Sequence, residues 1–153
     1  SLALLTPVQV VSQHQDASFL RTDPHSVVGF WVALEDATVE NGCLWAAPGS
    51  HTSGTVYKTF RRREGGRSEG TKGGACELFG DDIPEVASRT PLEVKAGTLV
   101  LLDGRLVHWS EENRSGKSRH AFSVHVVEGG KGVEWHASNW LQRTAACPFR
   151  ALY

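Results

Sequence analysis

His14 and Asp16 stand one residue apart, with Gln15 between them. On a β-strand, residues i and i+2 point to the same side, so this imidazole and this carboxylate would face one point in space. A single His-x-Asp occurs often by chance, and a polar edge strand explains it equally well. The motif therefore needs a third group before it indicates a site.

His108 supplies that third group, because it follows an apolar run that is typical of a strand. Two histidines and one carboxylate on a β scaffold match the facial triad of non-haem Fe(II) sites, which leaves three coordination positions open. A bidentate co-substrate and dioxygen would fill those positions. Zinc takes the same kinds of ligand, so the spacing alone does not decide the metal.

Arg119 begins another strand-like segment, eleven residues after His108. A guanidinium that points into a protein is costly unless an anion pairs with it. Arginine binds carboxylates through two parallel hydrogen bonds, so a dicarboxylate co-substrate would meet this requirement. Together with the triad, Arg119 favours an oxygenase over a zinc or manganese hydrolase or isomerase of the cupin type.

The elements that must position these residues are short strands between frequent glycine and proline turns, without a helical period. The strand-like segments are 8–16, 26–35, 43–47, 92–94, 98–103, 105–110 and 119–128. Residues 95–97 read as a hairpin-like connection, and in 119–128 apolar residues alternate with Arg119, Ala121, Ser123 and His125. The pattern predicts an all-β sandwich or barrel.

Residues 58–75 interrupt this pattern. Positions 58–72 hold six basic and two acidic residues, and five glycines fall between 65 and 74. We expect a flexible loop here, with the binding of phosphates such as those of coenzyme A as the alternative.

Length and composition limit the classes of protein further. With 153 residues, 40% hydrophobic and 22% charged, the chain is expected to be one globular domain, 1–153. A net charge of −1 provides no bulk attraction for nucleic acid or an anionic membrane, and the apolar run 99–102 is far too short to span a bilayer. Three dispersed cysteines, Cys43, Cys76 and Cys147, predict free buried thiols in a reducing compartment, and we expect a cytoplasmic protein.

Several stretches together resemble the phytanoyl-CoA dioxygenase family of Fe(II)/2-oxoglutarate oxygenases. They are HQDASFL (14–20), GFWVALEDATVENGCLWAAPGSHTSG (29–54), AGTLVLLDGRLVHWS (96–110), SRHAFSVHVVE (118–128) and NWLQRTAACPFRALY (139–153). The resemblance implies a double-stranded β-helix, the cupin-like jelly roll, with iron between its two sheets.

The resemblance also implies a role for each site residue. It implies that His14, Asp16 and His108 bind Fe(II), that Arg119 and Ser110 hold the far carboxylate of 2-oxoglutarate, and that Trp31 lines the co-substrate pocket. The implied reaction uses O2 to hydroxylate a C–H bond of a small organic or acyl substrate, and yields succinate and CO2. Related halogenases have a small residue where Asp16 stands, so hydroxylation is favoured over halogenation.

The sequence departs from the family pattern at its beginning. Family members have a long N-terminal portion before the His-x-Asp motif, whereas thirteen residues precede His14 here and residue 1 is not Met. We therefore expect a processed chain or a piece of a longer one, with open sheet edges, marginal folding and self-association. A truncated, non-catalytic product with weak metal binding is the alternative to an active oxygenase.

Overall fold

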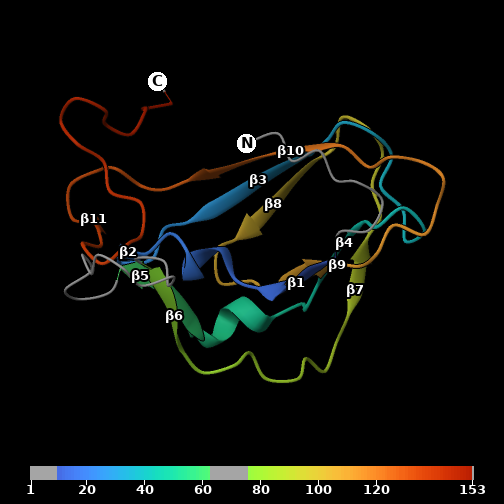
Figure 1. The fold of residues 1–153 in the computed structure, drawn as a ribbon, viewed down its shortest axis with the longest axis horizontal. Helices are drawn as coiled ribbons and strands as arrows, with labels where there is room; N and C mark the ends of the chain where they lie inside the picture. The colour runs from blue at the N-terminus through green and yellow to red at the C-terminus, as the bar shows by residue number, and fades with distance from the viewer. Residues whose placement is uncertain (1–9, 63–75, 153) are drawn as a thin grey trace, which may run out of the picture.

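Two antiparallel sheets face each other across the middle of the molecule in a computed structural model that describes residues 10–62 and 76–152 (Figure 1). The first sheet has the strand order β1 (Val11–His14), β9 (His108–Ser110), β4 (Leu44–Ala46) and β7 (Thr90–Leu92). The second has the order β10 (Ala121–Val126), β3 (Val28–Ala33) and β8 (Leu99–Asp103). These paired sheets confirm the all-β expectation and have the arrangement of a jelly roll.

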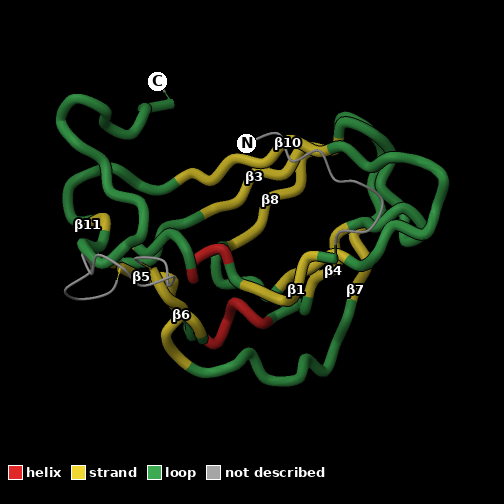
Figure 2. Tube along the Cα trace, in the orientation of Figure 1, coloured by secondary structure: helices red, strands yellow, loops and turns green. Residues whose placement is uncertain are grey.

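Two smaller pairs of strands lie beside the main sheets. They are β5 (Lys58–Arg62) with β6 (Cys76–Gly80), and β2 (Thr22–Asp23) with β11 (Glu134–Trp135). The described helices are single 3-10 turns, η1 (Asp16–Ser18) and η2 (Ser50–Ser53), and loops make up much of the remaining trace (Figure 2). Among the described residues, no helix has the length and apolar character needed to cross a membrane.

The structure corrects the predictions for two of the connecting segments. Residues 58–62 form β5 instead of a loop, because they pair along their whole length with β6 and the Phe60 ring packs 5.7 Å from that of Phe19. The rest of the predicted loop, 63–75, lies outside the described residues. The connection at 95–97 does not close a hairpin either, since β7 belongs to the first sheet and β8 to the second.

The core between the sheets contains Trp31 and Ala33 of β3, Leu44 of β4 and Leu102 of β8. Alternate residues of β3 are buried, as the two-residue period of a strand requires. Cys43 is buried beside them, and burial, followed by the charge of Glu93, raises the pKa of its thiol to about 11.

The prediction of buried thiols holds for Cys43 alone. Cys76 is half-buried, and Cys147 is exposed. Both lie in segments that the core between the sheets does not cover.

The outward surface of the second sheet is apolar. Leu99, Leu101, Phe122 and Val124 are 48%, 59%, 44% and 41% exposed, and Leu101 and Val124 both pair with Phe30 in the ladder. We call these four exposed residues the outer face. On β10, therefore, the apolar side of the alternation points away from the core, and the side with Ala121, Ser123 and His125 points inward.

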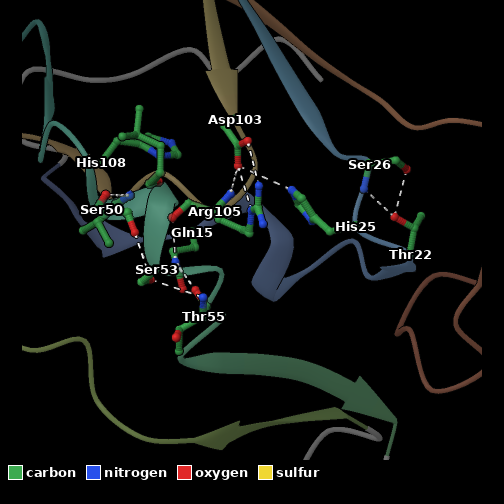
Figure 3. Close-up of polar contacts among 12 residues, drawn as sticks. Gln15, Thr22, His25, Ser26, Ser50, Ser53, Thr55, Asp103, Arg105 and His108 are labelled. Atoms are coloured by element: carbon green, nitrogen blue, oxygen red, sulfur yellow. Dashed lines mark hydrogen bonds and ion pairs between the residues drawn. The ribbon is translucent and has the colours of Figure 1, made fainter.

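Gln15 joins the segments that surround the first sheet. Its side chain is fully buried, and its Nε2 donates to the carbonyl oxygens of Thr55 at 2.9 Å and Arg105 at 2.6 Å (Figure 3). Its Oε1 accepts from the backbone N–H of Tyr57 at 2.9 Å. One amide therefore satisfies three backbone groups from two loops that are distant in sequence.

The outer face is expected to cause self-association, because this apolar surface is stabilised when it leaves water. The double substitution Leu101→Thr with Val124→Thr keeps β-propensity and should shift the chain toward monomer, as measured by analytical ultracentrifugation. Leu78→Thr is the matched control, since Leu78 is 54% exposed on β6 in a different sheet. Equal effects of the control and the double variant would contradict this role of the outer face.

Gln15→Leu should lower the free energy of unfolding by about 2–3 kcal/mol, because it leaves buried backbone groups without partners. Urea unfolding of the two proteins measures the difference. Gln142→Leu is the control, since Gln142 also donates to three carbonyl oxygens but in the peripheral 136–142 segment. No loss of stability in Gln15→Leu would show that these three hydrogen bonds do not hold the loops.

Candidate metal centre

Strand pairing places the two predicted histidine ligands side by side. His14 of β1 is the direct cross-strand partner of His108 of β9, and their ring centroids are 4.3 Å apart. Val11 pairs with Ser110, and a register shift between Val11 and His14 brings His14 opposite His108, where neighbouring side chains project to the same face of the sheet.

Asp16 reaches the same point by a different route from the one that the sequence predicts. The predicted strand 8–16 ends early, because β1 stops at His14 and Asp16 begins η1. Gln15 between them keeps an extended backbone, with φ −122° and ψ 132°. The alternation of side chains therefore survives: Gln15 points to the Thr55 and Arg105 side, while His14 and Asp16 share the other.

The ligand atoms of His14, Asp16 and His108 all lie within 4.8 Å of one another. Asp16 Oδ1 is 3.7 Å from Nε2 of His14 and 3.8 Å from Nε2 of His108. These separations are too long for hydrogen bonds. The three groups converge on a shared space without satisfying one another, as the ligands of a metal ion do.

Backbone carbonyls hold both imidazoles in the orientation that metal binding requires. Nδ1 of His14 lies 2.8 Å from the carbonyl oxygen of Ser12, and Nδ1 of His108 lies 3.0 Å from that of Leu106. Each Nδ1–H can donate outward, which leaves the Nε2 lone pair directed at the shared space.

The electrostatics of the site favour the protonation states of metal ligands. Burial lowers the pKa of His108, which keeps its imidazole neutral. Burial acts to raise the pKa of Asp16, but a hydrogen bond from His125 and the nearby histidines outweigh it, and the pKa ends below its usual value. Neutral imidazoles and an ionised carboxylate are the forms that bind divalent metals, so the residues fit an iron ion.

A cavity of about 240 Å³ opens beside this cluster, between the two sheets. Its lining includes every residue that the sequence analysis assigned to the site, namely His14, Asp16, His108, Ser110, Arg119 and Trp31. The structure thus brings together the full predicted set. Their roles as ligands and co-substrate contacts stay predictions.

Arg119 and Ser110 enter the cavity from opposite sheets and are both short of partners. Arg119 precedes β10, its Nε is buried without a hydrogen-bond acceptor among the described residues, and burial lowers the pKa of its guanidinium. Ser110 on β9 is fully buried, and its Oγ also lacks a partner within the described part of the chain. Arg119 is half-buried with a buried and unpaired Nε, and together with the unpaired hydroxyl of Ser110 it offers donors to an anion in the cavity.

Trp31 forms part of the wall beside this anion site. The ring is buried on β3, and Cζ of Arg119 lies 5.7 Å from its centroid. The indole face restricts the guanidinium while offering no hydrogen-bond acceptor that would compete with a carboxylate.

The cavity also contains His125, for which no role in the site was predicted from the sequence. Its Nε2 lies 3.1 Å from Oδ2 of Asp16, and this hydrogen bond raises the pKa of the His125 imidazole. The signal in the sequence was the two-residue alternation that puts His125 on the same side as Arg119. The alternation does not indicate that the partner of His125 is Asp16, on a distant segment.

Comparisons with known proteins agree with this geometry. The family model described as phytanoyl-CoA dioxygenase (PhyH) matches residues 6–121. A phytanoyl-CoA dioxygenase domain-containing protein 1 from Mus musculus is 46% identical over 146 residues, which cover 94% of this chain and 47% of that protein. A phytanoyl-CoA dioxygenase from Arabidopsis thaliana is 46% identical over 135 residues, covering 87% of this chain and 44% of that protein. The chain thus spans about half the length of the curated relatives it matches.

Solved structures share the fold. The non-heme monooxygenase ThoJ in its apo form aligns with a TM-score of 0.61 at 22% identity, covering 84% of this chain and 43% of that one. AviO1 from Streptomyces viridochromogenes aligns with a TM-score of 0.53 at 26% identity, covering 80% of this chain and 45% of that one. With the match of the family model over most of its length, the chain belongs to the phytanoyl-CoA dioxygenase (PhyH) family.

Proposed function

We propose that this chain forms the catalytic core of a 2-oxoglutarate-dependent non-haem iron dioxygenase that hydroxylates a C–H bond of a small organic or acyl substrate. The observation that carries the proposal is the unsatisfied pair Arg119 and Ser110, which faces the cavity that also contains the His14, Asp16 and His108 cluster. A metal site without a co-substrate would leave the buried, unpaired Nε of Arg119 unexplained.

In this proposal one group of residues binds the metal and another binds the co-substrate. His14, Asp16 and His108 would hold Fe(II) through two imidazole nitrogens and one carboxylate, which leaves three positions for other groups. Arg119 and Ser110 would bind the far carboxylate of 2-oxoglutarate, the guanidinium through a bidentate contact and the hydroxyl as a further donor. Iron, 2-oxoglutarate and O2 together would supply the oxidative decarboxylation to succinate and CO2 that powers hydroxylation.

The surroundings of the cavity would support that chemistry by restricting water. Trp31, Leu44 and Leu102 line it with apolar surface, all buried in the core between the sheets. In such a site the charge of Arg119 acts through a low dielectric and binds a carboxylate more strongly than it would in water. The three free thiols suit a reducing compartment, and we place the protein in the cytoplasm.

A second candidate is a non-catalytic product that binds metal weakly. The outer face favours it, since this sheet exposes large apolar side chains on the same strands that hold the site. Turnover of 2-oxoglutarate to succinate by the Fe(II)-loaded chain separates the two candidates, because the non-catalytic product would give none.

The three predicted ligands should bind metal as a unit. His14→Ala, Asp16→Ala and His108→Ala should each weaken Fe(II) binding by more than the roughly 10–100-fold that loss of an outer-shell partner causes. Anaerobic calorimetry with Fe(II) provides the measurement. His120→Ala is the control, because His120 is paired with Glu35 at the surface. If all three variants bind Fe(II) with wild-type affinity, the assignment of these residues as metal ligands is wrong.

Arg119 should recognise the co-substrate and not the metal. Arg119→Ala should leave Fe(II) affinity nearly intact and weaken 2-oxoglutarate binding by about 2–5 kcal/mol, the range for truncating one partner of a buried charge pair. Arg119→Lys should recover only part of this, because an ammonium lacks the planar fork.

Calorimetry of 2-oxoglutarate into the metal-loaded proteins makes this comparison. Arg114→Ala is the control, since Arg114 is 76% exposed and pairs with Glu112. Equal affinity in the wild type and both Arg119 variants would exclude Arg119 from the pocket. Absence of binding to the wild type would support the non-catalytic candidate.

A further inference from the structure

The two oxygens of the Asp16 carboxylate have different surroundings. Oδ1 faces Nε2 of His14 and of His108, at 3.7 and 3.8 Å. Oδ2 lies 3.1 Å from Nε2 of His125, which comes from β10 of the opposite sheet. One oxygen therefore faces the ligand cluster, while the other is held by a hydrogen bond from outside it.

His125 is placed to act on Asp16 and not to join the cluster. The converging group of ligand atoms comprises those of His14, Asp16 and His108, without the His125 nitrogens. An Nε2 that carries the proton donated to Oδ2 has no free lone pair, whether or not Nδ1 is also protonated, so Nε2 is not a metal ligand in this arrangement.

Gly29 provides the space in which these two side chains meet. It is the ladder partner of His125 on β3, and a Cβ at this position would lie 2.8 Å from Asp16 Oδ2 and 3.7 Å from His125 Cδ2. Its φ is not in the left-handed region, so the strand does not need glycine for its backbone conformation. A glycine inside a strand often marks a close approach, and here the group that approaches is the carboxylate.

We infer that His125 is a positioning residue that holds Oδ2 of Asp16 through the gap at Gly29, so that the carboxylate binds the metal through Oδ1 alone. The inference rests on the proposed function and deepens it. A carboxylate can bind a metal through one oxygen or through both. Two-oxygen binding would occupy one of the three positions that the co-substrate and dioxygen need, and His125 prevents it by occupying Oδ2.

Three variants test the inference, with Co(II) as the probe. His125→Leu keeps the bulk and removes the donor, whereas His125→Gln places an amide N–H near the position of the imidazole Nε2–H. Gly29→Ala inserts a methyl group against Oδ2 and displaces the carboxylate from its hydrogen bond. Absorption bands of bound Co(II) report its coordination number, and titration gives its affinity.

We expect His125→Leu and Gly29→Ala to alter the Co(II) bands and to lower affinity by about 10–100-fold, the effect of losing an outer-shell partner. His125→Gln should restore the wild-type bands. His120→Leu is the matched control, because His120 is also hydrogen-bonded to a carboxylate, that of Glu35 at 3.0 Å, but outside the cavity. A purely structural role for His125 would change the melting temperature and leave the bands of the remaining bound metal unchanged.

The outcomes separate the inference from the function on which it rests. Wild-type bands and affinity in both His125→Leu and Gly29→Ala would overturn the inference, while loss of Co(II) binding in Asp16→Ala would still support the metal site. If His125→Leu does not fold, unchanged bands in Gly29→Ala overturn the inference on their own. Absence of Co(II) binding to the wild type would overturn the proposed function and the inference together.

Discussion

Burial of the Asp16 carboxylate is the constraint on which the site depends, because an ionised group between two sheets is costly unless its surroundings stabilise the charge. The second sheet supplies the stabilising contact, from Nε2 of His125 at 3.1 Å, and the gap at Gly29 makes room for it, while His14 and His108 of the first sheet lie 3.7 and 3.8 Å away on the other side. The carboxylate is thus stabilised only where the sheets face each other at the correct distance. A shift of the second sheet that moved His125 away from Asp16 would remove this contact.

Arg119 and Ser110 differ from Asp16 in that their buried polar atoms lack hydrogen-bond partners among the described residues. The protein satisfies Asp16 through His125, but it leaves Nε of Arg119 and Oγ of Ser110 without such partners in the part of the chain that the structure describes. Unsatisfied buried polar groups lower stability, and the same cost becomes affinity when a ligand supplies the missing partner. Because Ser110 lies on β9 of the first sheet and Arg119 just before β10 of the second, a dicarboxylate that binds both would connect the two sides of the cavity, so co-substrate binding and stability are expected to be linked.

The sequence allowed the fold class to be predicted, together with the residues that meet at the cavity, but not every individual element. Residue types and spacing indicated His14, Asp16 and His108 although the predicted strand through Asp16 was wrong, because an extended Gln15 is sufficient for the alternation. The cost of a buried cation indicated Arg119. Residue spacing and the cost of burying a cation do not reveal the contact between His125 and Asp16, because these residues are more than a hundred positions apart. They do not reveal the space at Gly29 either. Strand β5 was predicted as a loop because its segment is rich in basic residues. Its pairing partner, β6, lies further along the chain, so the local sequence pattern does not indicate it.

The sequence pattern of β10 does not by itself predict which side of this strand faces the core. A strand that alternates between apolar and polar residues normally turns its apolar side inward. In β10 the inward side carries Ser123 and His125 because the cavity needs polar groups, and Phe122 and Val124 point outward. The strands of this sheet therefore carry the outer face on one side and, on the other, part of the site, including Trp31 and Gly29. One strand, β10, thus carries Phe122 and Val124 of the outer face and, on its other side, the His125 that contacts Asp16.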